Sequence, residues 1–422
     1  MSEEEKKESV GQHHHHHHSH HHKSKKKKSR SKFWNLVGKY KLQLAGVAVF
    51  FVLLITLIAV ALNEQPPEDG QGTTVSTQEQ PTQPSVQVEA GTLSLKIPHF
   101  SEPLTLIGQG AQAYMNAPIT APVADVLDSY HQTGQRLDVG APVNLSFEVL
   151  SLPGDCTVVA SKVEISERTV FTKAWSYDLA AKERSVELWN LKTGTVYHYR
   201  VTVYLSDGTE NGAFGSFETA SGPRIFNING LHNARDVGGW TTTDGKTLLQ
   251  GLLYRGAAPE NATQEGRDNL TRRLAVRNDM DLRGTDGDTP LGANVEHSVY
   301  AVQPYTGIFT AEGSPVIRNL FADLADRDNY PAYLHCTDGT DRTGTVCYLL
   351  QALLGVSEED LIRDFELSAL MSADVNRTRL KDMVNRLETY DGDTMQENVE
   401  NYLLEIGVTP REIAAIRDIW LG

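Results

Sequence analysis

A polar segment of ten residues in the C-terminal half of the chain has the residue types of a nucleophilic phosphate site. It reads His335-Cys336-Thr337-Asp338-Gly339-Thr340-Asp341-Arg342-Thr343-Gly344. Cys336 offers a thiolate nucleophile, and the planar guanidinium of Arg342 can bind two phosphate oxygens at once. The five residues between them are enough chain to encircle one phosphoryl group. The segment therefore predicts nucleophilic chemistry on a phosphate ester.

The flanking residues predict the elements that position this segment. Ala332 to His335 is typical of a core strand, and after Arg342 the apolar residues recur at helical spacing until Gly355, which ends the helix. These apolar residues are Val346, Leu349, Leu350, Leu353 and Leu354. Cys336 to Asp341 is thus a loop that leads into a helix N-terminus, where free backbone N–H groups and the helix dipole bind an oxyanion. The same field favours the thiolate form of the cysteine.

From residue 223 to residue 422, short apolar strands alternate with amphipathic helices. The stretch 277–283 looks like a second core strand. This pattern predicts an α/β domain, with a central sheet flanked by helices, that carries the Cys-x5-Arg loop.

Several separated stretches of this domain resemble the bacterial tyrosine phosphatase family with the His-Cys-x5-Arg-Thr-Gly loop, which is related to dual-specificity and lipid phosphatases. Besides the loop, they are Asn233-Ala-Arg235-Asp236-Val-Gly238-Gly239, Gly251-Leu-Leu-Tyr-Arg255, Asp281-Leu282-Arg283, and the helical segments that start at Gly355 and Gly407. The resemblance implies that Cys336 attacks phosphorus to form a phosphocysteine, which water hydrolyses, and that the reaction needs no metal and no cofactor.

The resemblance also implies roles for the residues around the nucleophile. His335 helps to set the loop and the thiolate, and the Thr343 hydroxyl eases departure of the sulfur. The phosphate is bound by Arg342 and by the loop residues Thr337, Asp338, Gly339 and Thr340. The residues expected to brace the loop are Asn233, Arg235, Asp236 and Arg283.

The proton donor for the leaving oxygen has more than one candidate. Some relatives use the aspartate directly before the loop arginine, which is Asp341 in this chain, and we prefer this residue. Asp286 and Asp288, in a Gly-rich stretch after Arg283, are alternative donors. They can also be explained as turn-forming residues.

The loop sequence bears on the substrate as well. Some relatives carry a lysine where this chain has Thr340, in a run associated with phosphoinositide hydrolysis, and Asp338 adds negative charge. Both features favour phosphotyrosine-type monoesters. The pattern Cys-x-Asp-Gly-x-Asp-Arg-Thr is also similar to the loop of myotubularin lipid phosphatases, so a lipid or phosphoinositide substrate stays open. A catalytically silent phosphate-binding module is a third hypothesis, which the joint presence of Cys336, Asp341 and Arg342 disfavours.

The N-terminal region predicts a membrane anchor. Residues 1–41 read as a disordered tail with nine histidines, which are a tag, a natural low-complexity tract or a metal-binding tail. Residues 42–62 are uncharged and long enough to span a bilayer as a helix. Basic residues precede this span, so the N-terminus is expected in the cytoplasm and the catalytic domain outside. The alternative is secretion after signal cleavage near Ala61.

Two further segments separate the span from the α/β domain. Residues 63–91 are rich in Gln, Pro and Thr and predict a flexible linker. Residues 92–222 show period-two alternation, for example at Tyr197, Tyr199, Val201 and Val203, which predicts an all-β sandwich. The stretch Leu191 to Val201 resembles the corner of fibronectin type III domains, where a tyrosine hydroxyl bonds to nearby backbone. Such a module serves as a spacer or docking unit, or contributes to substrate recognition.

Charge and cysteine content narrow the partners. Residues 63–422 contain 28 Lys and Arg against 50 Asp and Glu, so we expect no nucleic-acid partner. The expected partners are a phosphorylated protein or lipid substrate and the membrane. The three cysteines are too few for a disulfide scaffold. Cys347 is expected to be buried, with a redox partnership to Cys336 as the minor alternative, and Cys156 to be an exposed thiol. The sequence leaves the oligomeric state open.

Overall fold

The computed structural model describes residues 92–371 and 375–422, all of which belong to one compact unit, Val86–Gly422. The predicted tail, membrane span and linker (1–41, 42–62 and 63–91) lie outside the described residues. Among the helices that are described, none is long and apolar enough to cross a membrane.

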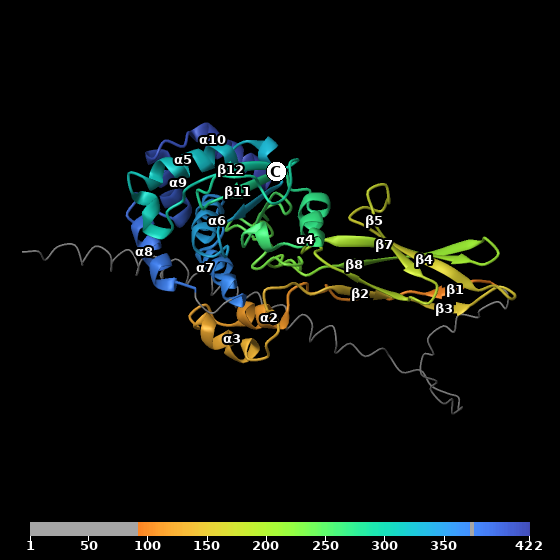
Figure 1. Cartoon of the computed structure of the whole chain (residues 1–422). Helices are drawn as coiled ribbons and strands as arrows, with labels where there is room; N and C mark the ends of the chain where they lie inside the picture. The colour runs from red at the N-terminus through yellow and green to blue at the C-terminus, as the bar shows by residue number, and fades with distance from the viewer. Residues whose placement is uncertain (1–91, 372–374) are drawn as a thin grey trace, which may run out of the picture. The chain divides into compact units, whose positions relative to one another are not determined.

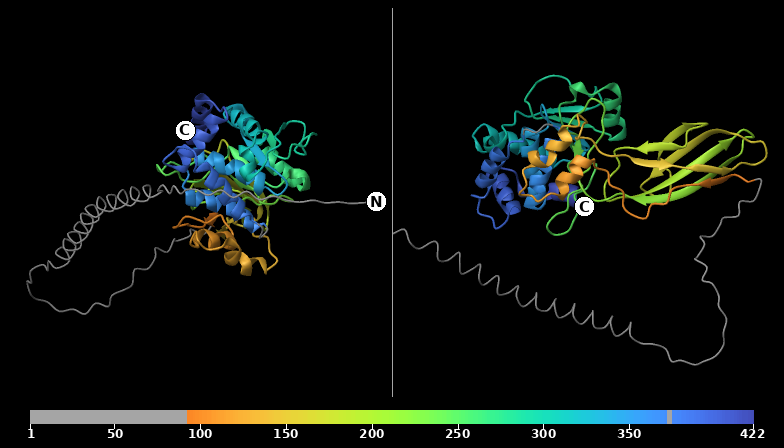
Figure 2. Two further views of the ribbon diagram at one scale, coloured as in Figure 1. Left: turned by 90° about the vertical axis from the view of Figure 1, so that its left-hand side faces the viewer. Right: turned by 90° about the horizontal axis from the view of Figure 1, so that it is seen from below.

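The first part of the described chain contains the predicted sandwich strands (Figure 2). Their bounds are β1 Ser94–Lys96, β2 Val143–Ser146, β3 Glu148–Ser151, β4 Val158–Ser166, β5 Trp175–Ala180, β6 Ser185–Leu188, β7 Val196–Leu205 and β8 Glu210–Glu218. A four-stranded antiparallel sheet has the order β5-β4-β7-β8, and the pairs β1-β3 and β2-β6 complete the sandwich. Alternate residues such as Val163, Ile165, Tyr199 and Val201 are fully buried in its core, as the period of two predicted.

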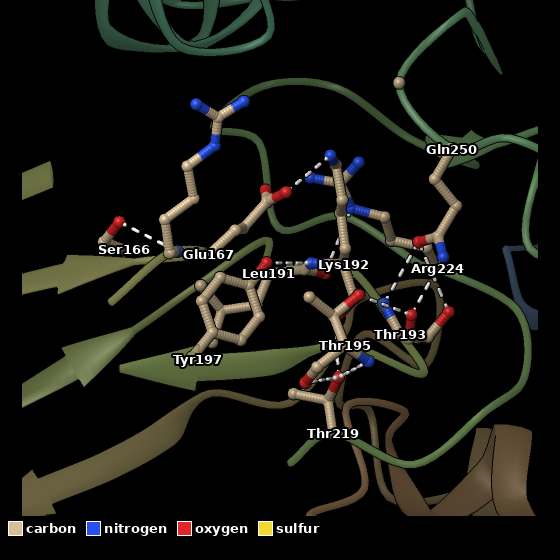
Figure 3. A network of polar contacts seen from close by, with 12 residues as sticks. Ser166, Glu167, Leu191, Lys192, Thr193, Thr195, Tyr197, Thr219, Arg224 and Gln250 are labelled. Atoms are coloured by element: carbon tan, nitrogen blue, oxygen red, sulfur yellow. Dashed lines mark hydrogen bonds and ion pairs between the residues drawn. The ribbon is translucent and has the colours of Figure 1, made fainter. Parts of the chain in front are cut away.

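The predicted tyrosine contact is present in this sandwich. The backbone N–H of Lys192 donates to the Tyr197 hydroxyl over 2.9 Å (Figure 3). The side chain of Tyr197, in β7, thus holds the turn that precedes this strand. This bond confirms the expected hydroxyl-to-backbone contact, whereas the resemblance of the sandwich to fibronectin type III domains stays a prediction.

Two helices interrupt the interval 92–222 that the sequence predicted as all-β. They are α2 Gln109–Asn116 and α3 Val123–His131. Their buried side chains Ala111, Tyr114 and Leu127 pack into the core of residues 223–422, which we call the catalytic part after its predicted loop. Arg363 of that part donates to the carbonyls of Tyr114 and Ala117 at the end of α2, over 3.1 and 2.9 Å. The helices form because their apolar residues find a partner surface there, which a search for strand periodicity overlooks.

The catalytic part is built on a five-stranded mixed sheet with the order β12-β11-β13-β10-β9. The first four strands of this order are parallel, and β9 runs antiparallel to β10. Their bounds are β9 Arg235–Asp236, β10 Leu253–Gly256, β11 Asn278–Asp281, β12 Glu296–Val299 and β13 Ala332–His335. The two strands predicted at 277–283 and 332–335 are therefore confirmed as β11 and β13.

Helices cover both faces of this sheet, as the run of buried residues in its parallel strands requires. Leu334 of β13 faces the core that contains α5 and α6, and Tyr333 faces the opposite core with Tyr254 and Leu270. The helices are α4 Gln264–Asp268, α5 Gly313–Leu324, α6 Asp341–Leu353, α7 Glu358–Glu366, α8 Arg377–Leu387, α9 Met395–Glu405 and α10 Pro410–Leu421. Short helical turns cover Pro259–Asn261, Asn269–Arg273, Tyr305–Phe309, Arg327–Asn329 and Leu367–Leu370.

Helix α6 is the centre of the catalytic part (Figure 1). Every residue from Thr343 to Leu353 is buried, because α6 packs against β13 on one side and against α7 and α9 on others. The sequence predicted a single buried stripe, so it underestimated this burial. Gly355, with φ +88°, ends the helix as predicted, and Cys347 is fully buried.

A buried network joins the sandwich to the catalytic part (Figure 3). Arg224 donates to the carbonyls of Asn190 and Leu191, over 2.7 and 3.0 Å, and to the carboxylate of Asp236 over 2.9 Å. The Thr193 N–H donates to the Gln250 side chain nearby. We call Arg224, Asp236 and the two carbonyls the sandwich junction.

Candidate active site

The predicted phosphate loop lies between β13 and α6, with Cys336 directly after the strand. The cysteine is 3% exposed, whereas Thr337 and Asp338 face solvent. Gly339 has φ +71°, and a Cβ on this residue would lie 2.4 Å from the backbone of Gly256. Only glycine fits this close approach, so the sharp turn that returns the chain toward α6 depends on it.

The carbonyl groups of the loop are bound from outside. The carbonyl of Thr337 accepts from the Ala258 N–H, that of Asp338 from the Asn233 amide, and that of Gly339 from the Arg255 guanidinium, each over 2.9 Å. In contrast, the N–H groups of residues 337–342 donate no hydrogen bond to any described residue. Thr340, at the N-cap of α6, makes no side-chain cap. Consecutive free N–H groups at a helix N-terminus form an oxyanion site.

Four buried side chains support the loop from behind, and we call Asn233, Arg235, Arg255 and Asp364 the loop brace. The carboxylate of Asp364 in α7 accepts from Arg235 over 3.1 Å and from Arg255 over 2.6 Å. Arg235 also donates to the Asn233 side chain over 2.5 Å. Burial lowers the pKa of Arg235 to about 10. Burial raises the pKa of Asp364, but the two guanidiniums outweigh this effect and hold it below its ordinary value.

His335 is buried beside the nucleophile. Its Nε2 lies 3.0 Å from Oδ1 of Asp279, and its Nδ1 lies 3.1 Å from the Cys336 carbonyl oxygen. Burial lowers the pKa of His335, but the Asp279 carboxylate outweighs this and raises it above the ordinary value. The Asp279 carboxylate therefore favours the protonated form of the imidazole at the base of the loop.

The residues after the loop arrange around its mouth. The Arg342 guanidinium reaches back across the loop to the Thr337 hydroxyl, 3.3 Å away, as expected for a residue that closes over a bound phosphate. The Thr343 hydroxyl is completely buried and has no hydrogen-bond partner among the described residues. Asp341 is exposed, and its Oδ1 accepts a hydrogen bond from the Tyr305 hydroxyl.

Two residues expected to brace the loop, Asp236 and Arg283, make no hydrogen bond to it. Asp236 belongs to the sandwich junction, where it also accepts from the N–H groups of Gly238 and Gly251. Arg283 pairs with Asp281 and Glu260, each at 2.7 Å, and makes no hydrogen bond to the loop. Asp236 does not contact the loop because adjacent residues of a strand face opposite sides of the sheet, so Arg235 and Asp236 cannot both face the loop.

The alternative proton donors are placed in the connection between β11 and β12. Asp286 and Asp288 are both exposed there, and neither makes a hydrogen bond or an ion pair with the rest of the described chain. The structure thus brings Asp341 to the loop and does not bring these two residues into contact with it.

Sequence reasoning missed several contributors. Arg255 lies in a stretch that supported the family resemblance, yet its hydrogen bond to the loop was not foreseen. Asp364 had a usable signal, because it follows Leu361 by three residues and thus lies on the buried face of α7. Tyr305 and Asp279 had no such signal.

A cavity of about 650 Å³ opens beside the loop. Its lining includes Thr337 and Asp338 of the loop together with His232, Glu260 and Arg283. His232 contacts the buried carboxylate of Asp138 at 3.1 Å. Arg283 and His232, the two basic side chains that line this cavity, therefore both contact carboxylates.

The sequence model described as the Tyrosine phosphatase family matches residues 226–422, the stretch that contains the loop and its brace. Residues 226–422 are therefore similar to the tyrosine phosphatase family. The α/β fold of this stretch, a mixed sheet with flanking helices, agrees with the predicted fold class. The described residues hold no cluster of three or more His, Cys, Asp or Glu side chains that could bind a metal ion.

Individual relatives are more distant. A curated protein of Cupriavidus necator, provisionally named a tyrosine-protein phosphatase, is 26% identical over 181 residues, which cover 36% of this chain and 66% of the relative. The match thus spans just under two thirds of that relative's length. The core catalytic domain of the PP-IP phosphatase SIW14 from S. cerevisiae, in complex with citrate, is similar over 37% of this chain and 93% of its own, with 17% identity and a TM-score of 0.28. A myokine structure is similar over 19% of this chain and 83% of its own, with 21% identity and a TM-score of 0.17.

Proposed function

We propose that the chain is a membrane-tethered cysteine-dependent phosphatase that hydrolyses phosphotyrosine-type monoesters outside the cytoplasm. The observation that carries the catalytic part of this proposal is the row of free N–H groups at residues 337–342, between the buried Cys336 and the half-buried Arg342. Such a row of N–H groups stabilises the negative charge on the equatorial oxygens of a phosphoryl group during its transfer.

In the first step, the Cys336 thiolate attacks phosphorus and the bond from phosphorus to the leaving oxygen breaks. The loop N–H groups and Arg342 bind the three equatorial oxygens, and the carboxyl group of Asp341 gives its proton to the leaving oxygen. Protonation of His335, which the Asp279 carboxylate favours, supports the thiolate before attack. The product is a phosphocysteine and the free alcohol or phenol.

In the second step, the Asp341 carboxylate takes a proton from water, and the water oxygen attacks phosphorus. The S–P bond breaks, inorganic phosphate leaves and the thiolate returns. Thr343 is proposed to ease the departure of the sulfur. Its hydroxyl has no hydrogen-bond partner among the described residues, so it has a hydrogen bond to give to the departing thiolate.

The cavity beside the loop favours substrates with one phosphate. A second phosphate would need a free cation, but Arg283 is paired with Asp281 and Glu260, His232 contacts Asp138, and Asp338 adds negative charge. This charge pattern suits an aromatic monoester better than a multiply phosphorylated inositol.

The decisive experiment measures phosphate release by the full chain in detergent from 4-nitrophenyl phosphate, a phosphotyrosine peptide and a phosphoinositide. We expect release from the first two, and we expect Cys336→Ser to abolish it. Equal release by wild type and Cys336→Ser would refute the mechanism. A clear preference for the phosphoinositide would instead establish the lipid alternative, and no release from any ester by the folded protein would indicate a silent binding module.

The membrane placement is proposed from the sequence, by the uncharged stretch 42–62 and the basic residues before it. We expect protease added to intact cells to digest residues 92–422. Full protection would place the phosphatase domain on the other side, and recovery of the domain from the medium would indicate cleavage near Ala61.

A further inference from the structure

We propose that Tyr305 is a positioning residue that orients the carboxyl group of Asp341 for proton transfer. This inference rests on the proposed function, because it needs Asp341 to act as the proton donor. Tyr305 lies in a helical turn more than thirty positions before Asp341 and was not singled out by its sequence.

The hydrogen bond from Tyr305 is the one restraint on Asp341 that the described residues provide. The Tyr305 hydroxyl donates to Oδ1, and the Asp341 side chain makes no other hydrogen bond or ion pair with them. An exposed aspartate at the first position of a helix is otherwise free to change rotamer. With Oδ1 fixed, Oδ2 is the oxygen left to face a leaving group at the mouth of the loop.

Tyr305 is itself attached to α6 at both ends. Its backbone N–H donates to the Thr345 hydroxyl over 3.0 Å, and its phenol hydroxyl donates to Asp341. Residues 341 and 345 are four apart and so share one face of α6. Tyr305 as a whole is 3% exposed, and its ring packs edge-on against Phe365, with 6.1 Å between the ring centres. The tyrosine therefore lies along the first turn of α6 as a rigid arm.

The backbone of Tyr305 is strained in this position. Its φ is +58°, in the left-handed region, which is unfavourable for a bulky residue. Such strain persists where surrounding contacts over-determine it, and it concentrates at functional sites. The contacts to Thr345 and Phe365 would retain the fold without a phenol hydroxyl, so the hydroxyl itself serves Asp341.

The test separates leaving groups that need a proton from those that do not. In Tyr305→Phe the ring and the backbone contact remain, and only the hydroxyl is lost. We expect kcat/KM for a phosphotyrosine peptide to fall about tenfold or more, a fraction of the ~10²–10⁴ that general acid catalysis supplies. For 2,4-dinitrophenyl phosphate, whose leaving group departs without a proton, we expect a change of at most about twofold.

Two companion variants complete the design. Asp341→Asn should show the same selectivity, and Tyr305→Phe combined with Asp341→Asn should lose no more than Asp341→Asn alone, because both changes act through one carboxyl group. Tyr300→Phe is the matched control: its hydroxyl donates to Asp323 over 2.6 Å, a similar tyrosine–aspartate pair without contact to the loop. We expect Tyr300→Phe to leave the ratio of the two esters unchanged.

The outcomes are distinguishable. If Tyr305→Phe slows both esters equally, or neither, the positioning role is refuted while Cys336-dependent release keeps the phosphatase proposal. If Asp341→Asn shows no selectivity, the proton donor lies elsewhere and the inference about Tyr305 also fails. If Cys336→Ser releases phosphate as wild type does, the proposed function itself fails.

Discussion

Arg235 and Asp236 are neighbours in the chain, yet they belong to two different buried networks. Arg235 is part of the loop brace, where two guanidiniums share the carboxylate of Asp364 and the network ends on carbonyls of the catalytic loop. Asp236 is part of the sandwich junction, where one guanidinium meets one carboxylate and the network ends on carbonyls of the sandwich corner. Similar pairs thus hold the predicted phosphate loop in one place and attach the sandwich in the other.

The electrostatic balance differs between the two networks. Two guanidiniums outweigh burial and lower the pKa of Asp364, whereas burial outweighs Arg224 and raises the pKa of Asp236. The negative charge of the buried carboxylate is therefore compensated more completely in the loop brace than in the sandwich junction. We therefore expect loss of the carboxylate charge to lower the free energy of unfolding more in the loop brace than in the sandwich junction. Only in the loop brace should this loss also lower the rate of phosphate release.

The largest effect is expected for Asp364→Asn. This change leaves two buried guanidiniums without a carboxylate, so the free energy of unfolding should fall by about 3 to 5 kcal/mol. Phosphate release should also drop, because Arg255 loses the partner that aims it at the Gly339 carbonyl. Chemical denaturation and kcat/KM on an aryl phosphate measure the two effects. A stable variant with normal activity would show that the loop does not depend on its brace.

The same carboxyl group predicts a pH dependence. A carboxyl whose folded pKa lies below its ordinary value of 3.8 stabilises the fold above that value, and the contribution is lost as the pH falls below it. The difference in unfolding free energy between wild type and Asp364→Asn should be constant from neutral pH to about pH 5 and shrink below that. Denaturation at a series of pH values measures it, and a constant difference throughout the acid range would contradict the depressed pKa.

Asp236→Asn makes the identical chemical change in the sandwich junction and should cost less. Arg224 keeps its two carbonyl partners, and the charge that is removed was incompletely compensated, so we expect a loss of about 1 to 2 kcal/mol. Activity of the folded protein should stay within about twofold of wild type. Denaturation curves and kcat/KM, measured beside Asp364→Asn, test the ranking. A larger loss than in Asp364→Asn would reverse our comparison.

Asn233→Gly separates loop geometry from stability. Asn233 has φ +55°, which glycine adopts without strain, so the variant removes the side chain that donates to the Asp338 carbonyl and accepts from Arg235 without changing the backbone. Stability should fall by about 1 kcal/mol. The rate should fall by about tenfold or more, because small displacements of a catalytic loop are costly. Matched unfolding and kinetic measurements test this prediction, which an unchanged kcat/KM would rule out.

The smallest effect is expected for Tyr197→Phe in the sandwich. It removes the single hydroxyl that accepts from the Lys192 N–H, a loss of about 0.5 to 1.5 kcal/mol. Activity should not change, because this corner contacts the sandwich junction and not the loop. Thermal unfolding and phosphate release measure the two quantities. Reduced activity in this variant would indicate coupling between the sandwich and the active site.

Residues close together in the chain were predictable. The strand, the loop and the helix around Cys336 occupy consecutive positions, so their periods and the spacing from Cys336 to Arg342 could be read directly. The predicted loop at 336–341 and the burial of Cys347 followed from the same local patterns. The alternation of side chains along a strand also predicts that Arg235 and Asp236 lie on opposite faces of β9.

What the sequence determined by itself is the catalytic loop, because a strand, a turn and a helix N-terminus are built from neighbouring residues. What only the tertiary structure decided is which distant side chains support that loop. Arg255, Asp364 and Tyr305 reach it from separate elements, and helices α2 and α3 enter the same core from outside the matched residues 226–422. The physical reason is that periodicity reports which face of an element is buried, while the identity of its partner depends on the packing of the whole chain.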